Sequence, residues 1–218
     1  TDEISFLPLS VDTIASVFSS DGSNVTTNPF ALRSADGTAL VSDVIATNNG
    51  GFAVSWTDTD TSFGSIRIFD SSGNAETNLF GSNLTGGAQL ANLDNERFIA
   101  AWDRNENPDD IFAQFFREDG SSVGNEFRLN EETQGNQTIN DITALPGGGF
   151  VAVWENPNAG DGPLEGTEIQ GRIFGSDGVP TTDEFTINTS SASKQDNARI
   201  AALADGRFVV TWEDDSRS

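Results

Sequence analysis

Carboxylates are the residues of this chain with the clearest capacity for chemistry. Acidic side chains gather just after each of the four Trp residues. Hard cations such as Ca²⁺ bind several carboxylate and carbonyl oxygens in flexible geometry, so these segments favour calcium as a cofactor. A solvated acidic surface without an ordered ion is the alternative. The residues assigned to metal binding are Asp58, Asp60, Asp103, Asp109, Asp110, Asp161 and Asp214.

The same carboxylates suggest glycoside hydrolysis, which needs one carboxylic acid and a second carboxylate as base or nucleophile. Repetition argues against it, because a catalytic pair should belong to one site and these acids recur after every Trp. The chain has no Cys and no His, which excludes thiol nucleophiles, His-based triads and thiolate or imidazole metal ligands. No nucleophile elbow, phosphate-binding loop or dinucleotide fingerprint is found. No residue is therefore assigned to catalysis.

Aromatic residues offer few candidates for ligand binding. A sugar-stacking platform usually needs an exposed flat ring, and most of the 16 Phe residues occupy repeated positions expected in a core. Tyr is absent. Phe63, in a predicted loop, is the residue assigned to ligand binding.

The charge balance limits the partners. The chain holds 34 acidic and 11 basic residues, a net charge of −23, which repels nucleic acid phosphates and anionic lipid surfaces. No apolar run reaches the length of a membrane span, and no targeting segment follows Thr1. We expect a soluble piece without nucleic acid partners or membrane insertion, whose export signal lies outside it.

Four recurring strand types would position these side chains. Each Trp ends a run such as Gly-Gly-Phe-Ala-Val-Ser-Trp, typical of a strand buried on both faces. A Val/Ile-x-Ala strand precedes this run. An alternating strand closed by a Gly turn follows it, and then a short Phe-x-Leu strand. The unit recurs roughly every 50 residues, a period typical of propeller blades or arrays.

The order of these strands predicts an all-β fold, a four-bladed β-propeller of four-stranded antiparallel blades, in a single domain of residues 1–218. Complete repeats span about 40–84, 89–130 and 141–188. Residues 1–33 supply the last two strands of a blade and residues 198–218 the first two, which predicts ring closure between the N- and C-terminal strands. A fragment of a longer propeller or an open β array is the alternative.

The repeats resemble those of large secreted bacterial proteins of the RTX and adhesin-like kind. The residues that carry the resemblance are 145–154 with 169–188, and 203–212. It implies export, calcium-rich surroundings and few cysteines, and it says little about activity.

These observations lead to a non-catalytic binding or adhesion module of a secreted bacterial protein as the main functional prediction. Its partner would be an extracellular glycan or protein surface, bound in a calcium-dependent way. Two alternatives stay open: a polysaccharide-acting enzyme, a hydrolase or lyase based on carboxylates, and a purely structural spacer. Release of reducing ends from a polysaccharide would distinguish the enzyme from the other two.

Overall fold

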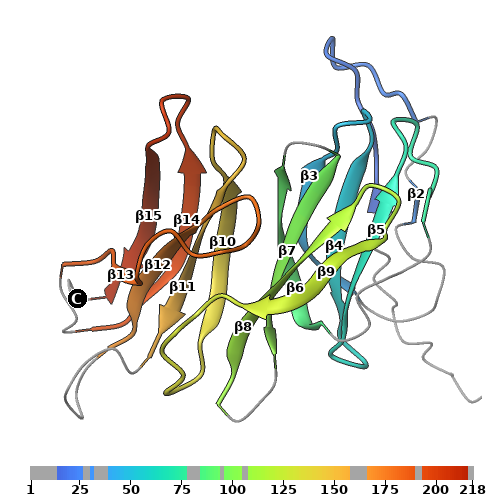
Figure 1. The fold of residues 1–218 in the computed structure, drawn as a ribbon. Coiled ribbons are helices and arrows are strands. Elements are labelled where there is room, and N and C mark those ends of the chain that lie inside the picture. The colour runs from blue at the N-terminus through green and yellow to red at the C-terminus, as the bar shows by residue number, and fades with distance from the viewer. Residues whose placement is uncertain are drawn as a thin grey trace, which may run out of the picture.

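The structure is a computed structural model that describes residues 14–26, 30–31, 39–77, 84–93, 96–104, 108–157, 166–189 and 193–215. The regular elements of this part of the chain are strands, arranged as a row of sheets (Figure 1). None of its segments forms a helix with the length and hydropathy needed to cross a membrane.

The strands form five antiparallel sheets: β1–β2, β3–β5, β6–β9, β10–β13 and β14–β15. Their bounds are β1 Ile14–Ala15, β2 Phe30–Ala31, β3 Ala39–Ala46, β4 Phe52–Asp58, β5 Gly64–Phe69, β6 Thr85–Leu93, β7 Arg97–Arg104, β8 Asp110–Arg117, β9 Ser122–Arg128, β10 Thr138–Ala144, β11 Phe150–Asn156, β12 Glu168–Phe174, β13 Phe185–Thr186, β14 Gln195–Ala202 and β15 Phe208–Asp214. The predicted all-β fold of antiparallel, four-stranded sheets is confirmed for β6–β9 and β10–β13. Most of the fourth strand expected beside β5 lies outside the described residues.

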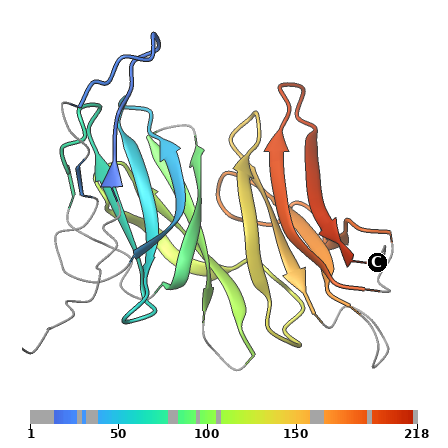
Figure 2. The same cartoon turned by 180° about the vertical axis from the view of Figure 1, so that it is seen from behind.

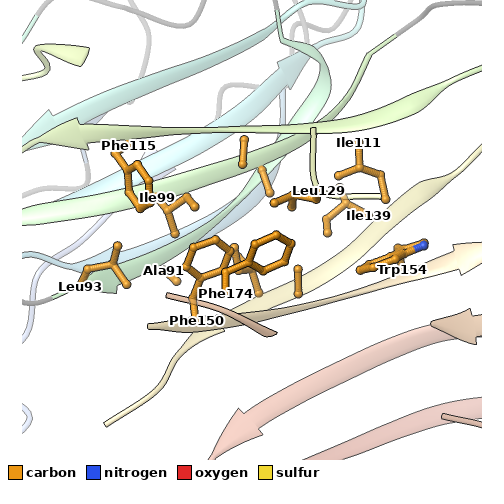
Figure 3. Close-up of a cluster of buried hydrophobic side chains, with 14 residues drawn as sticks. Ala91, Leu93, Ile99, Ile111, Phe115, Leu129, Ile139, Phe150, Trp154 and Phe174 are labelled. Carbon is orange, nitrogen blue, oxygen red and sulfur yellow. The ribbon is translucent and has the colours of Figure 1, made fainter. Parts of the chain in front are cut away.

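The Trp-containing strands β4, β7 and β11 are covered on both faces. In β11, Phe150, Ala152 and Trp154 pack against the β6–β9 sheet, in the core that Figure 3 shows. The alternate residues, Val151 and Val153, pack against the β14–β15 sheet. Because side chains alternate between the faces of a strand, a strand between two neighbouring sheets must be apolar throughout. This explains the unbroken hydrophobic runs and confirms a core position for Trp56, Trp102 and Trp154.

Stacked phenylalanines join each Trp strand to the next strand of its sheet. The cross-strand pairs are Phe52 with Phe69, Phe98 with Phe116 and Phe150 with Phe174. Their ring centroids lie 5.0, 5.6 and 4.7 Å apart, with nearly parallel planes. Such pairs stabilise one particular register between neighbouring strands.

The predicted ring closure is not found in the described residues. β1 pairs with β2 alone, and β15 pairs with β14 alone. The two ends do not pair because each packs on a different sheet. Ala15 of β1 packs on the core of the β3–β5 sheet, whereas β14–β15 packs on the β10–β13 sheet. Figures 1 and 2 show these two ends at opposite sides of the row, with three sheets between them.

Carboxylates at β-bulges tie neighbouring sheets together. The first strands of the β3–β5 and β10–β13 sheets each contain a register shift. It lies directly before Asp43 in β3 and directly before Asp141 in β10. Asp43 Oδ2 accepts a hydrogen bond from the Leu90 amide of β6 at 2.8 Å, and Asp141 Oδ2 accepts one from the Ile200 amide of β14 at 2.9 Å. Burial raises the pKa of both carboxyls. A bulge re-aims a side chain, and here it directs the carboxylate to the backbone of the next sheet.

We therefore expect Asp43→Ala to lower the free energy of unfolding by about 1–3 kcal/mol, because the Leu90 amide loses its acceptor in a partly buried place. Asp43→Asn keeps an acceptor oxygen and should be nearly neutral. Denaturant unfolding at pH 7 measures both changes. Equal destabilisation by the two variants would contradict a role for the hydrogen bond.

Candidate active site

The residues after Trp102 and Trp154 face the next sheet in the row, because side chains alternate along the strand. Asp103 follows Trp102 at the end of β7, and Glu155 follows Trp154 at the end of β11. Asp103 Oδ1 accepts a hydrogen bond from the Ile139 amide of β10 at 2.7 Å. The core strands thus carry both carboxylates to the bulge of β10, at the junction of the β6–β9, β10–β13 and β14–β15 sheets.

Asp103 has an unusual protonation equilibrium. Burial, together with the negative charges of Asp109 and Glu155, raises its pKa from 3.8 to about 7, against the opposing effect of the Ile139 amide. Removing a carboxylate from water penalises the charged form, and nearby like charges add to that penalty. The Asp103 side chain therefore holds a proton through much of the neutral range.

Glu155 is oriented by two amide donors. Glu155 Oε1 accepts a hydrogen bond from Asn140 Nδ2 at 2.8 Å and one from the backbone of Asn197 at 3.2 Å. Asn140 is the bulged residue of β10, and Asn197 lies in the bulge of β14 with a φ of 53°. Asn tolerates this left-handed conformation better than most residues do. The bulges of β10 and β14 thus together orient the Glu155 carboxylate.

An acceptor atom without a partner lies beside this pair. Asn140 is 8% exposed, and its Oδ1 is buried without a hydrogen-bond partner. A buried unsatisfied polar atom is costly, and the hydrogen bond that Asn140 Nδ2 donates to Glu155 offsets part of this cost.

A groove of about 490 Å³ opens next to Glu155. Asn136, Thr138 and Thr167 line it together with Pro157. Its size falls within the range of ordinary ligand pockets, and its polar lining offers hydroxyl and amide partners. Of the two carboxylates, Glu155 lines the groove, whereas Asp103 lies outside its lining, on the neighbouring β7 strand.

The raised pKa predicts a cost in stability. The folded protein keeps the Asp103 proton up to about pH 7, whereas the unfolded chain loses it near 3.8. Because the folded state binds the additional proton, stability falls as pH rises through this window. Asp103→Asn should therefore unfold at a higher temperature than the unchanged protein at pH 8, with a gain of at most about 4 kcal/mol. The difference should vanish near pH 4. A variant equal in stability at both pH values would show that the Asp103 carboxyl is not perturbed.

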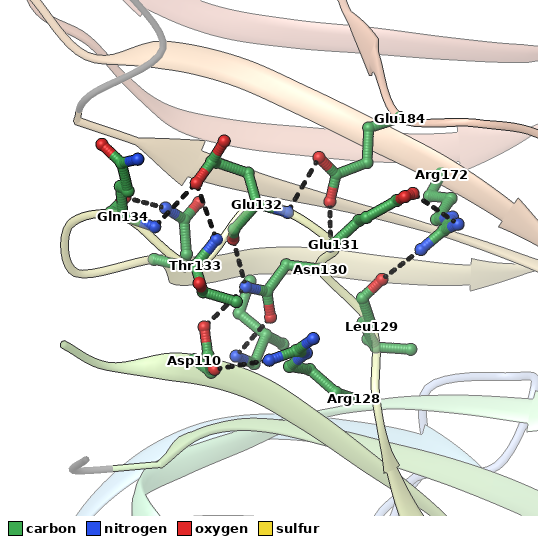
Figure 4. Close-up of polar contacts among 12 residues, drawn as sticks. Asp110, Arg128, Leu129, Asn130, Glu131, Glu132, Thr133, Gln134, Arg172 and Glu184 are labelled. Atoms are coloured by element: carbon green, nitrogen blue, oxygen red, sulfur yellow. Dashed lines mark hydrogen bonds and ion pairs between the residues drawn. The ribbon is translucent and has the colours of Figure 1, made fainter. Parts of the chain in front are cut away.

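Among the predicted metal ligands, the carboxylates of Asp58 and Asp110 interact with nearby residues of the chain. Asp58 Oδ1 accepts hydrogen bonds from the amides of Asp60 and Thr61, which closes the turn after β4. Asp110 forms an ion pair with Arg128 at 3.2 Å and accepts a hydrogen bond from Asn130, within the polar network of Figure 4.

Two further predicted ligands, Asp214 and Asp109, are described by the structure. Asp214 Oδ1 accepts a hydrogen bond from Gln195 Nε2 at 3.0 Å. Asp109 precedes β8, near Asp103, and Asp161 lies outside the described residues. Within the described residues, no group of three or more acidic side chains is arranged to hold a metal ion. Calcium binding stays a prediction of the sequence.

Phe63 lies in the turn between β4 and β5 with an exposed side chain. It belongs to the β3–β5 sheet rather than to the two sheets that carry Asp103 and Glu155, and its role in ligand binding stays a prediction. Sequence reasoning assigned no role to Glu155, Asn140 or Asn197. The position directly after Trp could have indicated Glu155, whereas the two bulges have no clear sequence signature.

Two solved structures show what the fold resembles. The endo-arabinase from Bacteroides thetaiotaomicron VPI-5482 is similar at 17% identity with a TM-score of 0.51, over 81% of this chain and 70% of that one. A mutant of the NanB sialidase from Streptococcus pneumoniae is similar at 13% identity with a TM-score of 0.59, over 85% of this chain and 30% of the sialidase. The likeness shows a β-propeller-like all-β fold. No family model and no curated protein sequence matches the chain.

This comparison contradicts the main functional prediction, a non-catalytic binding or adhesion module. The two similar structures carry the names of an endo-arabinase and a sialidase, which are enzymes that act on glycans. They favour the alternative, a polysaccharide-acting enzyme.

Proposed function

We propose that this chain hydrolyses glycosidic bonds with Asp103 as the general acid and Glu155 as the general base or nucleophile. The observation that carries the proposal is the unlike environment of the two carboxyls. Asp103 is driven toward its neutral form, whereas Glu155 is held by two amide donors. A carboxyl whose surroundings keep it protonated near neutral pH, with a second carboxylate close by, is the usual arrangement for a general acid and its partner.

The chemistry follows from these roles. Protonated Asp103 donates its proton to the glycosidic oxygen as the bond to the anomeric carbon breaks. The Glu155 carboxylate either removes a proton from the attacking water or attacks the anomeric carbon itself, and the configuration of the product distinguishes the two routes.

The argument from repetition does not exclude catalysis, because equivalent positions in the repeats carry chemically different side chains. The residues that follow the four Trp are Thr57, Asp103, Glu155 and Glu213. The first repeat offers a hydroxyl at this position. Asp103 is buried against the β10–β13 sheet, and its pKa is raised to about 7. A pattern repeated along the sequence thus produces one distinct site.

Charge and composition favour a neutral polysaccharide as substrate. A net charge of −23 repels polyanionic glycans. Sialidases use a Tyr nucleophile, and this chain has no Tyr, which also disfavours a sialoside. We take arabinan, the substrate class in the name of one similar structure, as the first neutral polysaccharide to test. An extracellular setting, implied by the resemblance to secreted repeat proteins, suits such a substrate.

The test is release of reducing ends from a panel of arabinan, other neutral polysaccharides and a sialoside. We expect turnover of at least one neutral polysaccharide by the unchanged protein and by Asp58→Asn, which alters an acid in the turn after β4. Glu155→Gln should lose activity by a factor of about 10² or more. Absence of turnover across the panel, or full activity of Glu155→Gln, would contradict the proposal.

A further inference from the structure

The β3–β5 sheet has an apolar area on one face, around Val44 of β3, that no neighbouring sheet covers. Leu90, Ile142 and Ile200 occupy equivalent positions in β6, β10 and β14 and are 3%, 4% and 9% exposed, because the preceding sheet covers each of them. The residue at this position in β3 is Val44, which is 59% exposed. The apolar side chain at this position is buried in three sheets and exposed in the fourth. This difference indicates that a sheet which would cover Val44 is missing.

The sheet at the other end has an uncovered face of the matching kind. Ala53, Ile99 and Val151 follow the first Phe of β4, β7 and β11, and each is 0% exposed because the next sheet covers it. Val209 holds this position in β15 and is 48% exposed. In the interior, this face packs on the face to which Val44 belongs. The two uncovered faces are therefore the two halves of an interface that the chain already makes between its own sheets.

The space in front of Val44 is a groove beside β1, lined by Val17, Val41 and Val44 among others. At the equivalent place in the interior, β6 and β7 lie beside β8 and pack on β10. The groove thus has the position of the first two strands of a sheet whose last two are β1 and β2. Among the described strands, β14 and β15 are the first two strands of a sheet and have no third strand beside them.

The phenylalanine pairs give the register. Phe18 forms an isolated bridge across its turn with Asn24, as Phe69 does with Ala75 and Phe174 with Pro180. Phe18 is therefore the equivalent of Phe69 and Phe174, and it is 62% exposed. Phe208 is the equivalent of their stacked partners and lies at the start of β15. Stacking Phe208 on Phe18 would place Val209 opposite Val17 and Trp212 opposite Ile14.

We propose that the β14–β15 hairpin of a second copy of this chain fills the groove beside β1, with its Val209 face on Val44 and Phe208 opposite Phe18. A second copy fits better than the same chain, since β1 and β14–β15 are each seated on their own core at opposite ends of the row (Figures 1 and 2). Two reciprocal contacts satisfy both free edges of both copies and close a two-fold ring, whereas an unclosed arrangement would leave strand edges open to further pairing.

The net charge of the chain determines how dimer formation depends on salt concentration. Each copy carries −23, so the copies repel one another at low ionic strength, and salt screens this repulsion while leaving apolar burial intact. We expect the dimer fraction to rise with sodium chloride.

The first test measures mass by light scattering after size exclusion at 0.05 and 0.5 M salt. We expect twice the chain mass of 23.2 kDa at high salt for the unchanged protein and for Val179→Asp, a control at an exposed valine in the turn after β12. Val44→Asp and Val209→Asp should stay monomeric while keeping the circular dichroism of the folded protein. A monomer at both salt concentrations, or dimers of both variants, would overturn the proposal.

The second test distinguishes a second copy from closure within one chain. The chain has no Cys, so Val17→Cys and Val209→Cys introduce single thiols at positions that the register makes opposite. Mixing the two single variants under oxidising conditions should give a disulfide-linked species of twice the mass, which neither forms to a comparable extent alone. If the double variant instead forms a disulfide within a monomer, the strand is completed by its own chain. Absence of any cross-link excludes the pairing.

Discussion

Asp103→Asn is expected to lower the rate of polysaccharide hydrolysis by about 10²–10⁴-fold, the usual contribution of a positioned general acid. The amide keeps the hydrogen bond to Ile139 but has no proton of suitable acidity to give. In the unchanged protein the rate should fall as pH rises through about 7, because the Asp103 carboxyl loses its proton there. The variant should lose this alkaline limb of the profile. Initial rates from pH 4 to 9 measure both effects.

A neighbouring variant separates the acid role from simple damage to the site. The negative charge of Asp109 helps to raise the pKa of Asp103, so Asp109→Asn should lower that pKa. The alkaline limb should then move to lower pH, while the rate at pH 5 stays near that of the unchanged protein. An unmoved limb in Asp109→Asn, or a limb that persists in Asp103→Asn, would assign the pH dependence to another group.

Trp154→Ala should lower the free energy of unfolding by about 3–5 kcal/mol, because it removes the largest apolar surface from a filled core and leaves a cavity. Trp154 is 0% exposed and packs in the core between the β6–β9 and β10–β13 sheets. Trp212 holds the equivalent position in β15 but is 37% exposed, so Trp212→Ala should cost clearly less. Denaturant unfolding of both variants, at low salt where the chains stay apart, provides the comparison. Equal losses would mean that the β14–β15 sheet is as well covered as the interior sheets.

Much of the fold could be predicted from the sequence, because strand type depends on local pattern. The buried Phe-to-Trp runs, the Gly turns and the short Phe strands all form where the repeats place them. Ring closure could not be predicted in the same way. A strand such as β15 has the same sequence whether its partner is β1 of its own chain, β1 of a second copy or solvent, so periodicity does not distinguish these cases.

The candidate site was harder to predict than the fold. Asp103 was recognised as acidic, but the pKa that gives it a role depends on burial against a sheet about 40 residues away in the chain. Glu155 depends on Asn140 and Asn197, which reach it through bulges in β10 and β14. A bulge shifts register by a residue without an obvious change in composition. Asp58 and Asp110, which were assigned to a metal, accept hydrogen bonds within their own turn and sheet, and their role in metal binding stays a prediction.

The position directly after each Trp has a consequence for how such a chain can diversify. The Trp and the apolar residues before it carry the packing, whereas the next residue lies at the edge of the core, beside the following sheet for Asp103 and Glu155. A gene that duplicates this unit therefore acquires a new copy whose chemistry can be changed by one substitution without loss of folding. The four repeats of this chain carry different residues at this position: Thr57, Asp103, Glu155 and Glu213.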